Sequence, residues 1–369
     1  MITSSRKMNA SQTIYAFLAG VSFILTFVYS ETAIDCARAS LSLCAKTIIP
    51  SLFPFIVISE IIVNSGLGNV IGKIFNKIFQ KLFGISSPSA CAVVLGALCG
   101  FPIGTKIILS LLDSGTIDKS EAEHLITFCN NPSSSFLINI VGISLYSNSA
   151  IGILLYCVTL INSALIGIIQ TIAMPSKKNK PILSHQKQKN SKSIFINAVT
   201  NSIPNILVIC SYIVFFSVLT GCIEKILSLL HCSILFSVSL HGIIEMTGGV
   251  AKSATLGNNI LSLCLTAFFI GWSGLSVHCQ MVSLCNGYNL NLKKYFISKI
   301  ILGFLNALSI SIIYYIKPSA FSPKQNTIST IYFPDLHEAW AKWCIILFAI
   351  AIVIYIFRKK HTSTVSIIY

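Results

Sequence analysis

Charged residues are scarce in this chain. Asp, Glu, Lys and Arg make up only 10% of its 369 residues, while hydrophobic residues make up 54%. Soluble domains carry about a quarter charged residues, so the composition excludes an ordinary soluble protein. The mean hydropathy is +0.80, and several apolar runs reach the roughly 20 residues that cross a bilayer as a helix. The sequence therefore predicts an all-α polytopic membrane protein.

Acidic residues and catalytic motifs are also in short supply. The chain holds only 11 Asp and Glu residues. It contains no H-E-x-x-H or G-x-S-x-G sequence and no pair of carboxylates spaced for acid–base chemistry. Its 13 cysteines are scattered without a C-x-x-C pair, which argues against a disulfide framework or a zinc site. We therefore expect no enzymatic activity, no metal site and no cofactor.

Positive charge is in excess, with a formal net charge of +15. The lysines lie between apolar runs and not on one basic face interleaved with aromatic residues, so we expect a lipid bilayer and no nucleic acid as partner. The segment 174–193 is rich in lysine and has no acidic residue. By the positive-inside rule this linker is cytoplasmic. Counting crossings from it places both termini in the cytoplasm as well.

Apolar segments recur in a similar order on either side of the linker. Residues 33–173 and 194–316 each read as a span, two interrupted apolar elements and another span. Internal repeats of this kind are common in secondary transporters. Counting crossings gives each half a re-entrant helical hairpin followed by a broken transmembrane helix, with the halves inverted: hairpins at 89–112 and 232–256, broken helices at 123–146 and 259–287.

The flanking segments complete the predicted organisation. Residues 1–32 carry an apolar run that we interpret as an uncleaved transmembrane helix, with a removable signal peptide as the alternative. Ala33–Thr47 mixes charged and apolar residues, which predicts an amphipathic helix in the membrane interface. Residues 317–369 predict an external loop, a last transmembrane helix and a basic tail.

Four breaks interrupt the hairpins and the broken helices. They lie at Gly100–Gly104, Asn130–Pro132, Glu245–Gly249 and Gly271–Ser276. Hydrocarbon offers free backbone groups no partner, so such breaks are tolerated only inside protein or along a wet cavity. Half-helix N-termini supply free N–H groups and a dipole that favours anions. We therefore expect the four breaks to meet in one cavity that binds a small organic anion.

The candidate substrate-binding residues are the glycines, prolines and polar residues at these breaks: Gly100, Pro102, Gly104, Thr105, Lys106, Asn130, Asn131, Ser133, Ser134, Glu245, Thr247, Gly248, Ser273, Gly274, Ser276, His278 and Gln280. Lys106 is expected to pair with a substrate carboxylate. Glu245 is expected to couple transport to an ion or to pair with Lys106 in the empty state. The alternatives are close helix packing for the glycines, snorkelling for Lys106 and a packing role for His278.

Five short motifs resemble a known family when they are taken in order: PSLFPFIVISEII, GFPIGTK, FCNNPSSSF, GIIEMTGG and GLSVHCQ. Together they are similar to the YlbJ (SpoVV) family of sporulation integral membrane proteins, within the wider group of nucleoside-recognition (Gate) domain proteins. The resemblance implies a membrane protein that moves dipicolinic acid across the outer forespore membrane. The wider group implies paired re-entrant hairpins and broken helices.

Two further functions stay open beside anion transport. Kinship at the level of the fold implies a nucleoside-type transporter, which is an analogy and not a derivation from the site. A membrane scaffold that assembles spore partners without transporting anything is the other. The sequence is also compatible with a homo-oligomer.

Overall fold

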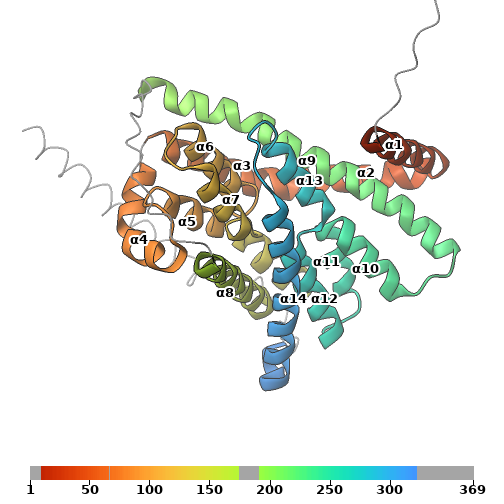
Figure 1. Cartoon of the computed structure of the whole chain (residues 1–369). Coiled ribbons are helices and arrows are strands. Elements are labelled where there is room, and N and C mark those ends of the chain that lie inside the picture. Colours follow the sequence, from red (N-terminus) through yellow and green to blue (C-terminus); the bar gives the residue numbers. More distant parts are fainter. Residues whose placement is uncertain (1–9, 66, 174–190, 322–369) are drawn as a thin grey trace, which may run out of the picture.

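The computed structural model describes residues 10–65, 67–173 and 191–321, and helices joined by short turns make up this part of the chain (Figure 1). Within it, helical segments long and apolar enough to cross a membrane occur at Ser30–Ile62, Ser149–Ala173, Ser193–Leu229, Ile260–Leu284 and Lys293–Ile316. The predicted all-α polytopic class is thereby confirmed. Nearly all of the predicted basic linker, and the predicted last helix and tail, lie outside the described residues.

The N-terminal region departs from its predicted division. The apolar helix α1 (Ala10–Val28) lies where the first transmembrane helix is predicted. After it, α2 (Ser30–Leu43), a π-helical turn η1 (Cys44–Ile48) and α3 (Ile49–Asn64) follow one another without a break. The predicted separate interface helix is therefore wrong, because α2 is the first part of one long helix. Pro50 has no backbone N–H, so one hydrogen bond of the helix is missing there. The π turn directly before Pro50 accommodates this missing bond.

The second half opens with a helix that is also longer than predicted. We expect a short amphipathic piece, a span and a helical link, yet α9 (Ser191–Leu229) runs through all three as one helix of 39 residues. Pro204 lies inside it without ending it. In Figure 1 α9 crosses the molecule alongside α2 and α3. Helices α9 and α2 approach closely, since a Cβ on Gly221 of α9 would lie 2.3 Å from Cys36 Sγ of α2.

Each half contains one helical hairpin with a break at its tip. In the first half α5 (Ser89–Cys99) and α6 (Ile103–Asp113) pack against each other, and in the second α10 (Ile234–Ile244) and α11 (Met246–Ala254) do the same. Gly100 ends α5 with a φ of 79°, a backbone conformation that glycine adopts most readily. The amphipathic helix α4 (Leu67–Phe83) leads into the first hairpin.

A broken helix follows each hairpin, and a long helix follows each broken helix. In the first half α7 (Lys119–Phe128) is separated from the π-helical η2 (Phe136–Leu145), and α8 (Ser149–Ala173) comes next. In the second half α12 (Ile260–Trp272) breaks before α13 (Gly274–Leu284), and α14 (Lys293–Ile316) comes next, with a short 3₁₀ turn η3 (Pro318–Phe321) after it. The predicted order of hairpin, broken helix and span is therefore present in both halves.

Hydrogen bonds join the two hairpins to opposite ends of the broken helix formed by α12 and α13. At one end, Tyr288 Oη donates to Asp113 Oδ2 (2.8 Å), which joins the end of the first hairpin to the loop between α13 and α14. At the other end, Ser262 Oγ donates to Ser253 O (2.6 Å) near the end of the second hairpin. Tyr146 Oη shares hydrogen bonds of 2.7 Å with Ser262 and with Thr266 there. Hairpins that open toward opposite ends agree with inverted halves, although the repeat itself stays a prediction.

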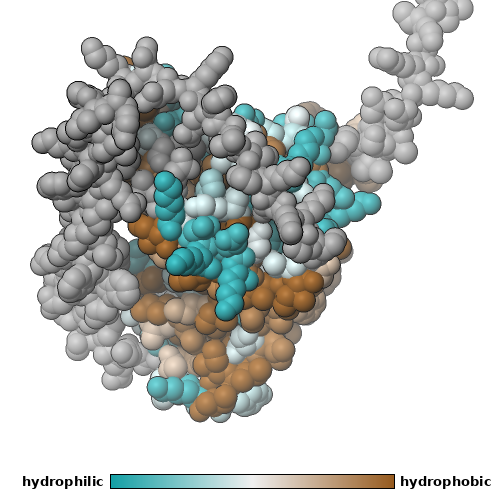
Figure 2. All heavy atoms as spheres, turned by 60° about the vertical axis from the view of Figure 1, so that its left-hand side comes forward, coloured by the Kyte–Doolittle hydropathy of each residue, from teal (hydrophilic) through white to brown (hydrophobic). Residues whose placement is uncertain are grey.

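Apolar packing holds each hairpin against its own neighbours. One buried cluster joins α5 and α6 to α3, α7 and α9, and a second joins α10 and α11 to η2, α8, α12 and α14. Figure 2 shows one face of the molecule, on which hydrophobic residues cover the lower part and hydrophilic residues gather above them. The space between the two clusters is where the helix breaks meet.

Candidate functional site

A cavity of about 380 Å³ lies between the two halves, at the helix breaks. Parts of η1, α3, η2 and α9 form some of its walls, and every break contributes at least one residue. These are Phe101 from the first break, Pro132 and Ser133 from the second, Glu245, Met246 and Thr247 from the third, and Ser276, Val277 and Gln280 from the fourth and the helix after it. Residues from all four breaks therefore line one space, and its ligand stays a prediction.

The α13 wall of the cavity presents polar atoms that have no partner. Ser276 and Gln280 are buried, with 1% and 3% exposed surface. Their Oγ and Oε1 atoms have no hydrogen-bond partner among the described residues. Four residues apart, the two side chains share one face of α13. Ser273, at the N-cap, leaves the helix uncapped because its hydroxyl donates to Ile270 O (3.4 Å). A buried polar atom without a partner costs about 1–3 kcal/mol, which a ligand or water in the cavity would offset.

The third break places a carboxylate on the cavity wall. Glu245 is the N-cap of α11, and its carboxylate accepts from the backbone N–H groups of Thr247 (3.0 Å) and Gly248 (2.6 Å). This helix N-terminus is therefore occupied by the protein's own anion and is not free for a ligand. Among the described residues no Lys, Arg or His lies within ion-pair distance of Glu245.

Two exposed polar side chains stand at the edge of the cavity. Lys46 belongs to the π turn η1 and Asn139 to the π-helical η2, and both line the cavity while remaining exposed. Wide turns of this type are frequent at functional sites. Lys46 is the basic residue on the cavity lining, so positive charge lies at its mouth and negative charge at Glu245.

The two asparagines of the second break lie behind the cavity and hold the first break in place. The backbone N–H of Phe101 donates to Asn131 O (2.7 Å). Asn131 Nδ2 donates to Phe128 O and to Ser163 Oγ, both at 2.9 Å. Gly100 allows this contact, because a Cβ there would lie 2.4 Å from Ser133 N. The asparagines therefore position the tips and do not face the cavity.

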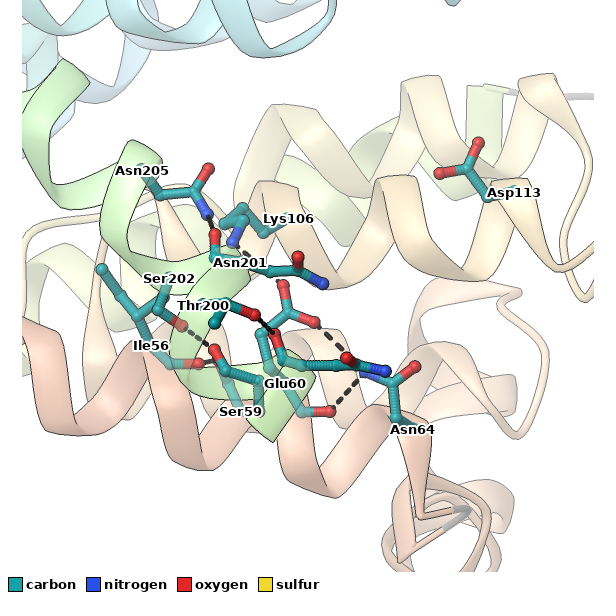
Figure 3. A network of polar contacts seen from close by, with 12 residues as sticks. Ile56, Ser59, Glu60, Asn64, Lys106, Asp113, Thr200, Asn201, Ser202 and Asn205 are labelled. Carbon is teal, nitrogen blue, oxygen red and sulfur yellow. Dashed lines mark hydrogen bonds and ion pairs between the residues drawn. The ribbon is translucent and has the colours of Figure 1, made fainter. Parts of the chain in front are cut away.

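Lys106 pairs with a residue that differs from both of its predicted partners. Its Nζ lies 2.9 Å from Glu60 Oε1, and the two side chains keep only 14% and 19% of their surface exposed. Figure 3 shows this pair between α6 and α3, beside Asn201 and Asn205 of α9. The predicted pairing of Lys106 with Glu245 is wrong, and Lys106 does not line the cavity.

The second hairpin carries a similar ion pair. Lys252 Nζ on α11 lies 2.5 Å from Glu224 Oε1 on α9 and donates to Ser237 Oγ at 3.2 Å. In both halves, then, a lysine on the second helix of the hairpin binds a glutamate on a long helix. This correspondence is a feature that the sequence comparison of the halves does not reveal.

Of the seventeen predicted site residues, those that line the cavity are Ser133, Glu245, Thr247, Ser276 and Gln280. The others lie around it or behind it: Gly100, Pro102, Gly104, Thr105, Lys106, Asn130, Asn131, Ser134, Gly248, Ser273, Gly274 and His278. Thr105 Oγ1 lies 3.4 Å from Asn130 Oδ1 and 3.2 Å from Met281 Sδ, and its hydroxyl donates to one of them. His278 Nδ1 shares a hydrogen bond with Tyr295 Oη (3.0 Å). Thr105 thus packs α6 against α13, and His278 packs α13 against α14. For His278 this agrees with the packing role given as its alternative.

Two basic residues at or behind the cavity are not among the predicted ones. Lys46 is predicted to face the membrane interface, yet it borders the cavity. Lys299 reads as one of the lysines that flank a span, yet it is fully buried in α14 and its Nζ donates to Asn130 O and to Asn131 Oδ1. No group of three His, Cys, Asp or Glu side chains that could hold a metal ion occurs in the described part of the chain.

Comparison with known proteins supports the resemblance of the motifs. The chain is 22% identical over 349 residues to "Sporulation integral membrane protein YlbJ" of Bacillus subtilis (strain 168), an alignment that covers 83% of this chain and 84% of that protein. No family model and no solved structure matches the chain. Membership of the nucleoside-recognition group therefore stays a prediction. With its long apolar helices, the chain is an integral membrane protein related to the YlbJ family of sporulation proteins.

Proposed function

We propose that this protein transports a small organic anion, with dipicolinic acid as the leading substrate, across the outer forespore membrane during sporulation. The observation that carries the proposal is the cavity lined by residues from all four helix breaks. Its volume falls within the usual range for small-molecule sites. Binding at discontinuous helices between two structurally similar halves is the arrangement of secondary transporters.

The α13 wall supplies the features that favour an anion. A helix N-terminus without a side-chain cap presents N–H groups and a positive dipole end. The Ser276 hydroxyl lies beside it and can donate to a carboxylate, whereas Gln280, whose unpartnered atom is the acceptor Oε1, can donate only through Nε2. Lys46 at the mouth attracts an anion from solution. These groups would bind a carboxylate through hydrogen bonds, while no buried lysine from the described part of the chain lines the cavity.

Glu245 sets a condition on anion binding. At a separation of about 5 Å and an effective dielectric constant of about 20, two like unit charges repel by roughly 3 kcal/mol. A substrate carboxylate would therefore bind more tightly if a proton or a small cation bound at Glu245 at the same time. This gives Glu245 the coupling role that is expected from the sequence, and it predicts that uptake depends on pH or on a cation.

Uptake into proteoliposomes tests the proposal. Labelled dipicolinate should accumulate with the wild-type protein, and the S276A/Q280L double variant should reduce uptake at least tenfold. Ser283→Ala is the matched control, since Ser283 lies on the same helix, is exposed and does not line the cavity. Equal uptake by the double variant and this control would contradict the assignment of the cavity. Glu245→Gln should retain some uptake and lose its dependence on pH or cations.

One observation favours a nucleoside as the second candidate. Glu245 and Gln280 together offer a carboxylate and a carboxamide on the cavity wall, which suits a neutral ligand with hydroxyl and amide groups. Unlabelled nucleosides that compete with dipicolinate, or that are taken up in its place, would support this reading. Folded protein that takes up neither compound would support the scaffold.

The orientation in the membrane is part of the proposal. We place both termini and the basic linker in the cytoplasm, from the distribution of lysines alone. A reporter fused within residues 317–338 should then be accessible from outside the cell. A cytoplasmic reporter at this position would reverse the assignment.

A further inference from the structure

Lys299 is a buried lysine without an acidic partner among the described residues. It has 0% exposed surface and lies near the start of α14. Its Nζ donates to the backbone oxygen of Asn130 and to Asn131 Oδ1, the latter at 3.3 Å. Among the described residues no Asp or Glu lies within ion-pair distance of Nζ. Two neutral oxygens from the second break therefore bind this ammonium group.

The orientation of the Asn131 amide follows from its other contacts. Its nitrogen must face Phe128 O, because a carbonyl oxygen accepts and cannot donate. The amide oxygen is therefore the atom turned toward Lys299. Asn131 Nδ2 also donates to Ser163 Oγ, whose own proton goes to Phe128 O. The oxygen that binds Lys299 is thus fixed in place by the surrounding network.

The end of α7 adds negative potential at the same place. The last carbonyls of α7 face side chains of other helices: Ser163 Oγ donates to Phe128 O (2.7 Å), and Ser298 Oγ lies 3.2 Å from Thr127 O. A helix C-terminus carries about half a negative elementary charge and favours cations. Asn130, whose backbone oxygen accepts from Lys299 Nζ, comes directly after the C-cap of α7, so this nitrogen lies at the C-terminal end of the helix.

We propose that the Lys299 ammonium group is a tethered cation that fills a monovalent-cation site at the C-terminal end of α7. Discontinuous transporter helices can bind a coupling ion through backbone carbonyls and a helix C-terminus. In this chain the same kinds of ligand hold a side chain. The site is therefore always occupied and needs no dissolved ion. The Lys299 site lies behind the cavity, so its role does not depend on which ligand the cavity binds.

Removing the side chain should convert the position into a site for a free cation. Lys299→Ala would leave the Asn130 and Asn131 oxygens without their donor and would open a space shaped like the lost atoms. Propylammonium matches the lysine atoms beyond Cβ, and 1-propanol has nearly the same shape without the charge. Tetramethylammonium carries the charge but has no N–H group to donate, so it controls for ionic strength.

The experiment measures the melting temperature of the full-length protein in detergent. Lys299→Ala should melt at a lower temperature than the wild type. Propylammonium should raise that temperature in a saturable way, whereas 1-propanol and tetramethylammonium should not, and the wild type should respond to none of them. Equal recovery with 1-propanol would mean that the side chain only fills space, and this would overturn the proposal. No recovery with propylammonium would overturn it too.

Two further variants decide the matter if Lys299→Ala does not yield folded protein. Lys299→Met keeps the length of the side chain without a donor, and Lys299→Gln keeps a neutral donor. The proposal expects both variants to melt below the wild type. A glutamine variant as stable as the wild type would show that a donor suffices and that no cation is required. A stable methionine variant would refute the proposal in the same way.

Discussion

The ion pair between Glu60 and Lys106 provides a quantitative test of how the first hairpin is held. The two charged atoms lie 2.9 Å apart, and their side chains are mostly buried. At an effective dielectric constant of about 20, Coulomb's law gives an attraction of roughly 6 kcal/mol at this distance. Desolvation of both groups offsets more than half of it. We therefore expect a net coupling of about 2 kcal/mol between the two side chains.

A double-mutant cycle measures this coupling. Glu60→Gln should lower the free energy of unfolding by about 2–3 kcal/mol, because it leaves the largely buried Lys106 without a counter-charge. Lys106→Met should cost a similar amount. The double variant should cost clearly less than the sum of the two single changes. Reversible unfolding in mixed SDS and dodecylmaltoside micelles provides the free energies.

The exposed pair of Asp35 and Arg38 is the internal control for this cycle. Its atoms lie 3.7 Å apart, and the side chains are 68% and 78% exposed. Water screens such pairs, so the corresponding cycle should give a coupling below about 0.5 kcal/mol. Effects of Glu60 and Lys106 that simply add would refute the reasoning. The hairpin would then be held by apolar packing alone.

Two more substitutions test the packing of the second half. Gly249→Ala places a Cβ 2.1 Å from Gly242 Cα, so it should push α10 and α11 apart. Overpacking of this kind costs about 1–3 kcal/mol, so the melting temperature should fall by more than about 5 °C. Gly20→Ala is the control, because its Cβ meets no atom within 4 Å and should not lower the melting temperature. A Gly249→Ala variant with the melting temperature of the wild type would contradict the close contact. Tyr146→Phe removes the hydroxyl that bonds two hydroxyl groups of α12 and should cost about 1–2 kcal/mol in unfolding free energy, whereas a change within error would show that water replaces it.

The helix breaks could be predicted because their signal is local. Glycine, proline and asparagine inside an apolar run interrupt a helix by their own backbone chemistry. Asn131 and Gly274 therefore mark breaks that the structure contains. Their convergence on one cavity also follows from a general rule, since broken backbone at membrane depth has to be buried or wet.

The long helices could not be divided correctly from the sequence. Proline suggests an interruption, yet Pro50 follows a π turn and Pro204 lies within the continuous α9. The polar residues of α2 suggest an interface helix, whereas α2 packs along α9. In both cases contacts with a distant helix decide the structure, and a local pattern cannot report them.

The pairing of buried charged side chains could not be predicted from the sequence either. Lys106 binds Glu60 across 46 positions in the chain, and nothing in either segment indicates the other. Lys299 stands near the start of a span, where lysine usually marks the membrane surface. Its burial depends on the second break, which lies beside α14 and far from it in the sequence.

The hydrogen bond from Phe101 to Asn131 determines which parts of the cavity can move separately. It unites the tips of the first two breaks into one wall. The other two tips are in close contact as well, since a Cβ on Gly274 would lie 2.8 Å from Met246 N. The cavity thus lies between two pairs of tips, and each pair is held together by its own contacts. Behind it, Lys299 joins the second break to α14, and Tyr146 joins the first half to α12. Any widening of the cavity must therefore separate one pair of tips from the other, while each tip keeps its own bonds.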